Sequence, residues 1–451
     1  MKKAGIAAAV AVAALGGVIA AIVLASGGGS DGSSSSSTRA TSTRTAPVGT
    51  TAPTTTARVT TSENTTRRAA TGPVDTSGVR LPPPPGRRGT RARTFVVGTA
   101  DDSLAQVDPQ FAQAQADISH DAGFDAAAIS ATWHRGERRP PATLVQVLRT
   151  VSASTKKAQM QLAIVLWHGL GSDTPQTPAE RAEFAAYAGA LVKALPEVRD
   201  VIVGNEPNLS TFWKPQFGVG GRDLAARAYA DLLARSYDAI KAAAPGVRVL
   251  GGALSPRGAD RPGGSRPTHS PTAFIRDLGA AYRASHRSRP LMDAFALHPY
   301  MQASSVPPTA AHPKNTSITL TDYPKLVALL TEAFQGTAQA GARLPIYYTE
   351  FGVQTAVPAP KRRFYLDLSS PARTDSVSFA VQGAYYRLAL ELAYCQPTVR
   401  GLFVFHTFDE PSLSGWQSGL YFADRTPKPS LPAFKRAVAD LRNGRLPRCH
   451  R

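Results

Sequence analysis

Two glutamates stand directly after runs of apolar residues, an unusual place for a charged side chain. Glu206 ends the run 201–206, Val-Ile-Val-Gly-Asn-Glu, and Glu350 ends the run 345–350, Pro-Ile-Tyr-Tyr-Thr-Glu. A carboxylate at the end of an apolar strand costs free energy unless something compensates it. Two carboxyl groups that face each other can hydrolyse a glycosidic bond, one protonating the leaving oxygen while the other attacks the anomeric carbon. The structural alternative is a pair of salt-bridged glutamates on the rim of the fold.

After residue 93, eight short apolar runs alternate with longer amphipathic segments. This alternation predicts βαβ units with a parallel sheet, and eight units predict a closed (β/α)8 barrel, the TIM-barrel fold, over residues 94–451. An open, doubly wound sheet is the alternative, but no glycine-rich phosphate loop follows the first strand, which argues against nucleotide binding. The predicted strands are Thr94–Thr99, Ala126–Ala131, Gln161–Leu166, Asp200–Gly204, Arg248–Gly252, Ala294–Leu297, Pro345–Thr349 and Gly401–His406. The predicted helices are Leu104–His120, Ala142–Thr155, Ala179–Leu195, Leu224–Ala244, Thr272–Tyr282, Tyr323–Ala340, Asp375–Tyr394 and Pro429–Arg442.

The barrel brings the two glutamates to one end. Active sites of (β/α)8 enzymes lie on the carboxyl ends of the strands, and the ends of strands four and seven face each other across the mouth. The segments 255–271, 301–322 and 353–374, after strands five, six and seven, are long and rich in proline, glycine and polar residues, whereas most helix-to-strand connections are short. We therefore expect Glu206 and Glu350 to converge at the mouth.

Two motifs resemble those of clan A of the glycoside hydrolases. Asn-Glu-Pro at 205–207, after an apolar fourth strand, is similar to the signature of that clan, and Thr-Glu-Phe-Gly at 349–352 resembles its seventh-strand nucleophile motif. The resemblance implies that Glu206 is the acid/base and Glu350 the nucleophile, and that Asn205 bonds the sugar 2-hydroxyl. It also implies a retaining double displacement, with the two carboxyl groups about 5–5.5 Å apart.

The resemblance covers residues 94–442 in architecture. Within the clan, the chain resembles cellulase-like family five or xylosidase-like family thirty-nine. One departure concerns the eighth strand, which commonly ends with tryptophan in the clan but here reads Phe-Val-Phe-His at 403–406. Phe405, His406 or a returning Trp416 is the expected substitute for that tryptophan in the floor of the sugar site.

The two glutamates need different surroundings. The acid needs a raised pKa, and the nucleophile must stay ionised through hydrogen-bond donors. His298 and Tyr300 follow the sixth predicted strand, next to Glu350 in barrel order. The resemblance implies that Tyr300 donates a hydrogen bond to the nucleophile, and we expect His298 to contact the sugar or a carboxylate. The alternative is that both side chains pack under the loop.

All four tryptophans of the chain, Trp133, Trp167, Trp213 and Trp416, lie at or just beyond predicted strand ends. A sugar ring needs a flat apolar platform, and indole adds a hydrogen-bond donor. We therefore expect the tryptophans to line the mouth, with chance clustering as the alternative. His168, next to Trp167, has two equal readings, a substrate contact or a structural hydrogen-bonding histidine.

No metal or cofactor is expected. The nine histidines include no pair at zinc-binding spacing, and no acidic calcium-loop pattern occurs. The two cysteines, Cys395 and Cys449, are either free thiols or, in an oxidising compartment, a disulfide that ties the tail to the barrel.

The amino-terminal 93 residues carry no expected chemistry. Lys2 and Lys3 precede the uncharged run Ala4–Ala25, which is typical of a secretory signal peptide or of a single-pass membrane anchor. The segment 26–93 is rich in Ser, Thr, Gly, Pro and Arg and predicts a disordered spacer. Residues 1–93 hold about half of the net charge of +19, but no aromatic residue is interleaved with the charges of the segment 26–93, so a solvated linker is favoured over a nucleic-acid binder.

Together these features predict an exported or membrane-anchored, monomeric retaining hydrolase that acts on an extracellular or cell-envelope poly- or oligosaccharide. The alternatives are a non-catalytic carbohydrate-binding barrel, a transglycosylase that uses the same carboxylate pair, and a basic surface adhesin for anionic polymers. Sugar identity, linkage and exo or endo action depend on the three long loops.

Overall fold

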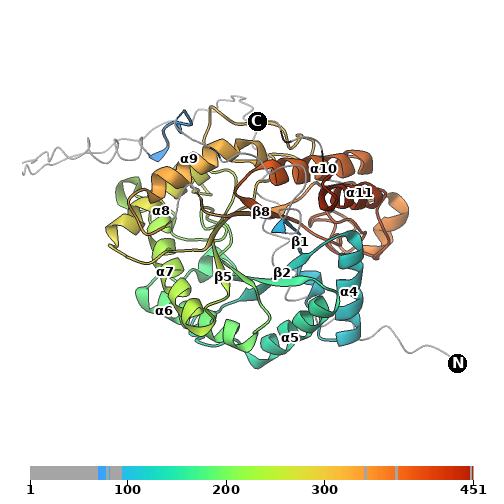
Figure 1. The fold of residues 1–451 in the computed structure, drawn as a ribbon, viewed down its shortest axis with the longest axis horizontal. Coiled ribbons are helices and arrows are strands. Elements are labelled where there is room, and N and C mark those ends of the chain that lie inside the picture. The colour runs from blue at the N-terminus through green and yellow to red at the C-terminus, as the bar shows by residue number, and fades with distance from the viewer. Residues whose placement is uncertain are drawn as a thin grey trace, which may run out of the picture.

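Eight parallel strands close into one barrel in chain order (Figure 1). The computed structural model describes residues 70–77, 81, 94–339, 343–370, 374–446 and 449. The first and last strands are paired, with Val96 opposite Gly401, so that the sheet has no free edge. The (β/α)8 fold predicted from the sequence is confirmed. The strands are β1 (Val96–Ala100), β2 (Ala126–Thr132), β3 (Gln161–Trp167), β4 (Asp200–Val203), β5 (Arg248–Leu254), β6 (Ala294–Leu297), β7 (Ile346–Phe351) and β8 (Val399–Val404).

Helices surround the barrel as an outer ring (Figure 1). They are α4 (Pro109–Ala122), α5 (Ala142–Lys157), α6 (Pro178–Ala194), α7 (Ala225–Ala243), α8 (Pro271–Ala284), α9 (Tyr323–Phe334), α10 (Phe379–Cys395) and α11 (Leu431–Arg442). Short 3-10 turns occur in the connections: η1 (Asp102–Leu104), η2 (Gly171–Asp173), η3 (Val219–Gly221), η4 (Leu320–Asp322) and η5 (Ala359–Phe364). Each predicted helix has its counterpart among them.

Capping residues explain where the observed helices depart from the predicted ranges. The predicted helix 104–120 is divided, because the Asp108 side chain accepts the backbone N–H groups of Gln110 and Phe111 and so starts α4 at Pro109. In the same way the Ser378 hydroxyl accepts the backbone N–H of Val381, and α10 starts there rather than at 375.

The core has two layers, one inside the barrel and one between the barrel and the helices. Small side chains dominate the inner layer, mainly alanines from β1, β2, β3 and β6, together with Phe403 and Tyr347. Gly98 on β1 makes room for the Phe403 ring, since a Cβ at this position would lie 2.3 Å from a ring carbon. Leucine, isoleucine, valine and aromatic side chains fill the outer layer. The barrel interior is thus filled by apolar side chains, and the polar side chains described below lie at the ends of the strands.

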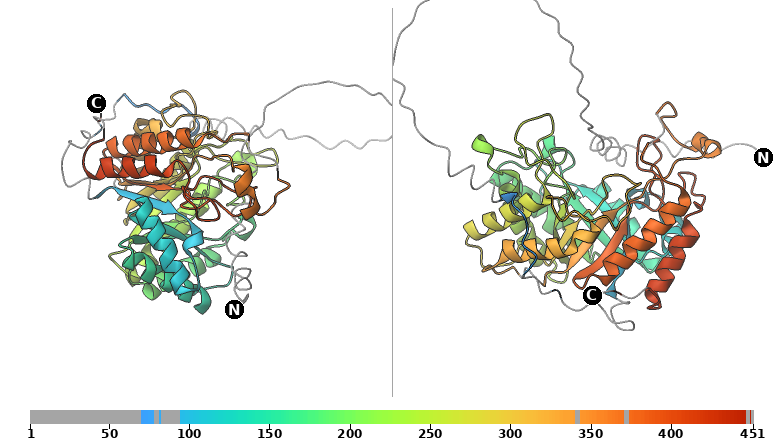
Figure 2. Two further views of the ribbon diagram at one scale, coloured as in Figure 1. Left: turned by 90° about the vertical axis from the view of Figure 1, so that its right-hand side faces the viewer. Right: turned by 90° about the horizontal axis from the view of Figure 1, so that it is seen from above.

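A described part of the amino-terminal segment lies against the barrel. The Arg276 guanidinium donates to the carbonyl oxygens of Ala70, Gly72 and Pro73 and also bonds Glu332 on α9, so residues 70–77 lie beside α8 and α9 (Figure 1 and Figure 2). These residues belong to the range expected to be a spacer, of which 26–69, 78–80 and 82–93 are not described. The apolar run 4–25 also lies outside the described residues. None of the helices described is long and apolar enough to cross a bilayer.

A disulfide joins Cys395, the last residue of α10, to Cys449 near the chain end, with the Cα atoms 5.2 Å apart. It closes a loop that contains β8 and α11, the last βα unit of the barrel.

Candidate active site

The end of β4 turns sharply to present Glu206. Gly204 has a φ of 85° and Glu206 itself a φ of 40°, a left-handed conformation that non-glycine residues seldom adopt. Such conformations cost on the order of 1–3 kcal/mol and gather at functional sites, where the surroundings hold them. Here the Glu206 N–H donates to the Ala253 carbonyl on β5 at 2.9 Å. The backbone is therefore fixed in the conformation that brings this carboxylate into the mouth.

The side chain of Asn208 stabilises the loop after β4 through hydrogen bonds to the loop after β5. It is fully buried; its amide N–H group donates to the carbonyls of Ser255 and His269, and its carbonyl accepts the Ser255 N–H at 2.9 Å. This side chain ties the β4 connection to the β5 connection. The residue stood beside the Asn-Glu-Pro motif in the sequence, but its type gave no sign of this structural role.

His298 lies between the two carboxyl groups. Its Nδ1 atom is 3.2 Å from Oε1 of Glu206 and 3.5 Å from Oε2 of Glu350. The two glutamate oxygens are therefore no farther apart than the sum of these distances. Glu206 and Glu350, which come from β4 and β7, converge as the sequence predicts, and both side chains stay partly accessible, at 12% and 20%.

Tyr300 holds Glu350 from the side. Its hydroxyl donates to Oε2 of Glu350 at 3.0 Å, and its own carbonyl accepts a hydrogen bond from Arg257 at 3.0 Å. The hydrogen bond that the resemblance implied for Tyr300 is thus present in this structure. One oxygen of Glu350 has both Tyr300 and His298 beside it, which leaves the other oxygen for a substrate.

Burial raises the pKa of Glu350 to about 7, with the Glu206 charge adding to the rise and the charge of His298 and the Tyr300 hydrogen bond opposing it. Burial acts to lower the pKa of His298, but the charges of Glu350 and Glu206 outweigh it, and the net shift is upward. The sequence led us to expect a fully ionised nucleophile. The structure differs, because the effect of burial on the pKa of Glu350 outweighs that of the His298 charge and the Tyr300 hydrogen bond.

An aromatic wall closes the site next to Glu350. The ring of Trp416 lies 5.0 Å from that of Tyr300 and 5.6 Å from that of Phe405. Phe405 follows β8 directly and belongs to the inner layer of the barrel. Phe405 and Trp416, two of the residues that the sequence offers as substitutes for the clan's tryptophan, thus lie in contact with each other beside Tyr300.

Beyond this wall, His406 and Glu410 form a second polar pair. Burial lowers the pKa of His406 to about 3, so the imidazole is neutral, and its Nε2 atom lies 3.8 Å from Oε1 of Glu410. Burial also raises the pKa of Glu410 to about 8, with Asp101 and Asp102 among the charges that add to the rise. Sequence reasoning missed Glu410 and Asp102, although each follows a predicted strand at the mouth end.

The tryptophans on the other side of the rim are placed differently from our expectation. Trp133 is fully buried, with its indole N–H donating to the Glu137 carbonyl at 2.7 Å, and Trp213 is 1% exposed with its ring against Tyr229. Neither offers a ring face to a sugar. Their positions just beyond strands predict the end of the barrel at which they lie, but they do not predict the direction in which the side chains point.

Trp167 and His168 are also buried, at 5% and 3% exposure. His168 packs edge-on against Trp213 at 5.3 Å and its Nδ1 lies 3.3 Å from the Leu170 carbonyl. Burial lowers its pKa to about 4. Of the two readings of His168 from the sequence, a substrate contact or a structural hydrogen-bonding histidine, these contacts favour the second.

Asn205 precedes Glu206 and is half-buried at the mouth.

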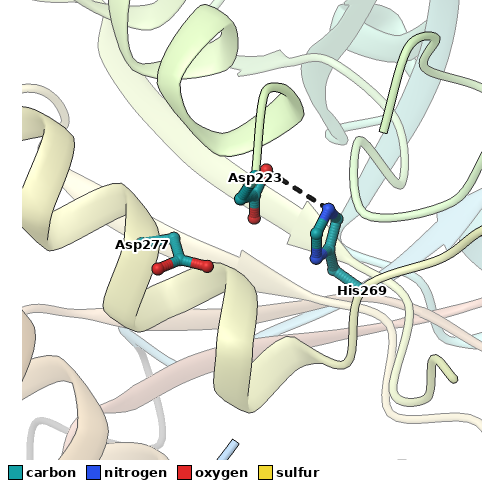
Figure 3. A group of neighbouring side chains, drawn as sticks. All are labelled: Asp223, His269 and Asp277. Atoms are coloured by element: carbon teal, nitrogen blue, oxygen red, sulfur yellow. Dashed lines mark ion pairs between the residues drawn. The ribbon is translucent and has the colours of Figure 1, made fainter. Parts of the chain in front are cut away.

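A separate group of side chains outside the mouth has the composition of a metal site. Asp223, His269 and Asp277 place one potential ligand atom each within 4.8 Å of one another (Figure 3). However, the Nε2 atom of His269 faces the Gln216 carbonyl at 3.0 Å as well as Asp223 at 3.3 Å. Since a carbonyl only accepts, this nitrogen carries a hydrogen and acts as a donor. This Nε2–H group therefore faces two oxygen acceptors, the Gln216 carbonyl and the Asp223 carboxylate, and this nitrogen is not a free metal ligand.

Comparison with solved structures finds similar barrels among glycoside hydrolases. A family 39 glycoside hydrolase from Bacteroides cellulosilyticus WH2 is 19% identical with a TM-score of 0.52, over 77% of this chain and 66% of that one. A subfamily 18 member of family 5 from Streptomyces cattleya, in complex with Manβ1-4GlcNAc, is 17% identical with a TM-score of 0.50, over 77% of this chain and 80% of that one. This chain thus spans just under two thirds of the family 39 structure.

At such identities the likeness shows the (β/α)8 fold. No family model matches the chain, and no curated protein matches its sequence.

Proposed function

We propose that this protein is a retaining O-glycosyl hydrolase, with Glu206 as acid/base and Glu350 as nucleophile. The observation that carries the proposal is the pair of carboxyl groups from opposite strands that share one imidazole nitrogen, His298 Nδ1. Two carboxyl groups facing each other at the carboxyl ends of barrel strands are the machinery of glycoside hydrolysis. The comparisons support the same chemistry, because the similar barrels are those of glycoside hydrolases.

The spacing of the carboxyl groups favours retention. Inverting enzymes keep the two carboxyl groups about 6.5–9.5 Å apart to leave room for a water, whereas retaining enzymes keep them at about 5–5.5 Å. The two oxygens beside His298 are separated by at most the sum of 3.2 Å and 3.5 Å, which only just reaches the lower limit of the inverting range. Direct attack by Glu350 is therefore favoured over attack by a water.

In the first step, the free oxygen of Glu350 attacks the anomeric carbon while the Glu206 carboxyl gives its proton to the leaving glycosidic oxygen. The glycosidic C–O bond breaks, an ester forms between the sugar and Glu350, and the leaving group departs as an alcohol. Tyr300 donates to the other oxygen of Glu350 and so orients the carboxylate for attack.

In the second step, Glu206, now ionised, removes a proton from a water that attacks the same carbon. The ester bond breaks, Glu350 leaves as a carboxylate and Glu206 is protonated again. His298 stays beside both groups, whose charges raise its pKa and so favour its protonated form, and in that form it stabilises whichever carboxylate is ionised. Asn205 would bond the sugar 2-hydroxyl, as the resemblance implies.

The aromatic wall of Tyr300, Phe405 and Trp416 would contact the sugar ring that is cleaved, since flat apolar surfaces suit sugar faces. The substrate belongs to the extracellular or cell-envelope poly- and oligosaccharides if the run 4–25 directs export, as its sequence predicts. That location is part of the proposal.

A panel of 2-deoxy-2-fluoro glycosides with good leaving groups tests the assignment. Such substrates slow the second step more than the first, so the covalent intermediate accumulates and mass spectrometry of peptides locates it. We expect the label on Glu350, no label in Glu350→Gln, and a longer-lived label in Glu206→Ala. A label on another residue would overturn the roles. Binding of sugars without turnover of any aryl glycoside would instead favour a non-catalytic binding barrel.

A further inference from the structure

The mouth end of the barrel carries almost all of the exposed large apolar side chains that the structure describes. Six of seven lie in connections that follow a strand or in the first turn of the next helix, and the seventh, Leu81, lies in the amino-terminal segment. Single exposed apolar residues are ordinary, but a gathering of them marks an interaction site. The six are Val107, Phe111, Val219, Phe364, Leu366 and Leu368.

Three of them belong to one segment after β7, which we call the rim strap, residues 359–369. Phe364, Leu366 and Leu368 are 45%, 59% and 56% exposed. The strap begins with η5, which stands out from the rest of the ribbon in Figure 2. Three large apolar side chains within five residues form the densest exposed apolar group of the described chain.

The strap is held firmly from below. Tyr365 is 4% exposed, and its hydroxyl donates to Oδ2 of Asp409 at 2.8 Å. Asp409 in turn pairs with Lys428 at 2.6 Å, both side chains being fully buried. The backbone of Leu366 bonds Pro411 and Leu413 in the loop after β8. The apolar side chains are exposed although their backbone is fixed, so they do not fold back onto the barrel.

Positive charge accompanies these apolar side chains. Lys361 pairs with Asp424 at 2.7 Å, but neither Arg362 nor Arg363 forms an ion pair with a carboxylate among the described residues. Arg363 lies over the Phe364 ring at 4.8 Å, and Arg362 donates to the Leu368 carbonyl. Two guanidinium groups therefore border the apolar side chains of the strap.

We propose that the rim strap docks the mouth of the barrel onto the surface of an anionic phospholipid bilayer. Leucine and phenylalanine side chains that insert at the headgroup boundary, flanked by arginines that meet anionic headgroups, are the features of an interfacial membrane contact. A saccharide contact fits less well, because the strap offers one aromatic ring, and leucines supply neither a flat ring face nor hydrogen bonds. The proposal does not depend on the chemistry proposed for the glutamates.

Fluorescence of a probe on the strap tests this in the full chain. The chain has two cysteines and both are in the disulfide, so Leu366→Cys introduces one free thiol for an environment-sensitive dye. The matched control is Ser288→Cys, an exposed position between α8 and β6 at the opposite end of the barrel. Each protein is mixed with vesicles of phosphatidylglycerol and phosphatidylcholine in equal parts, or of phosphatidylcholine alone.

We expect a blue shift and a rise in intensity of roughly twofold or more at position 366 on the anionic vesicles, weakened by salt, and no such change at 288. The double variant Arg362→Gln/Arg363→Gln in the Leu366→Cys background should lose most of this response. Equal responses at 366 and 288 would mean that another part of the chain binds the vesicles and would overturn the proposal. Equal responses on the two vesicle types would overturn it too. A response to protein concentration without vesicles would assign the strap to a second copy of the chain.

Discussion

Two sides of the same rim carry similar residue types but use them differently. After β6 and β7, and beyond β8, His298, Tyr300 and Trp416 lie around Glu350 and leave it partly accessible. After β3 and β4, His168 and Trp213 pack against each other and are almost fully buried. Both sets follow strands of one barrel. The difference arises because the first set lies beside a carboxylate that needs partners, whereas the second fills space between strands and helices.

Residue type and strand-end position therefore do not by themselves make a site. The His168 ring faces a backbone carbonyl, whereas the His298 ring lies between two carboxylates whose charges raise its pKa. Substitutions on the first side should therefore change activity, and substitutions on the second side should change stability.

The largest effect is expected at Glu350. Glu350→Ala removes the proposed nucleophile, and the rate of aryl glycoside hydrolysis should fall by at least about 10⁴-fold. Added azide should restore part of the activity, since a small anion fits the space left by the carboxylate and attacks the same carbon. Steady-state kinetics with and without azide measure this, with circular dichroism as the control for folding. Unchanged activity would remove Glu350 from the mechanism.

His298 and His168 form the next test. His298→Asn takes away the imidazole that lies between both carboxyl groups and should lower kcat by about 10²–10³-fold. The matched variant His168→Asn should keep kcat within about threefold and instead lower the free energy of unfolding by about 1–3 kcal/mol, because it disturbs a buried ring contact. Kinetics and urea unfolding distinguish the two. Equal losses of kcat would mean that both sides of the rim serve the reaction.

Tyr300 controls the pH dependence. The pKa of Glu350 is about 7 in the free protein, and the nucleophile must be ionised, so kcat/KM should rise with pH through about 7 on its acid limb. Tyr300→Phe removes a donor that favours the ionised form, which should move this limb to higher pH and lower kcat by about tenfold. Tyr282→Phe, whose hydroxyl bonds the Arg289 carbonyl at the other end of the barrel, should leave the profile in place. An acid limb that stays where it was in Tyr300→Phe would contradict the proposed contact.

Trp416 and Trp133 test the aromatic wall. Trp416→Leu should raise KM by about fivefold to tenfold while leaving the fold intact, because it removes a ring face next to the cleaved sugar. Trp133→Leu should leave KM unchanged and cost about 3–5 kcal/mol of unfolding free energy, as expected of a buried aromatic ring. The opposite pattern would show that Trp133, and not Trp416, lies at the sugar site.

The last prediction concerns the pH dependence of stability. The raised pKa of Glu350 means that the folded protein binds a proton more tightly than the unfolded chain does, so its contribution is favourable below about pH 4.5 and is lost as pH rises through about 7. Glu350→Gln is neutral at every pH. It should stabilise the protein by about 1–3 kcal/mol more at pH 8 than at pH 4. Urea unfolding at the two pH values measures it; a gain that is larger at pH 4 would mean that the carboxylate is stabilised by its site.

Much of the fold could be predicted because the strands are buried on both faces and read as continuous apolar runs. The meeting of Glu206 and Glu350 followed from barrel geometry alone. The orientation of Trp133 and Trp213 could not be predicted, because it depends on the side chains against which each ring packs. These are Phe184 for Trp133 and Tyr229 for Trp213. The φ of 40° at Glu206 has no signal in a residue of that type. The raised pKa of Glu350 depends on the packing around it, which local sequence does not report.

The disulfide between Cys395 and Cys449 makes the stability of this protein depend on the redox conditions around it. The loop that it closes spans 54 residues and includes β8, whose pairing with β1 seals the barrel. Linking the ends of such a loop contributes on the order of 4 kcal/mol in the chain-entropy model. Trp416 lies within this loop, so reduction of the disulfide would weaken both the pairing of β1 with β8, which we call the seam, and the aromatic wall of the candidate site. Protein made in a reducing cytosol should therefore unfold first at this seam, and oxidative refolding should restore both its heat resistance and its turnover.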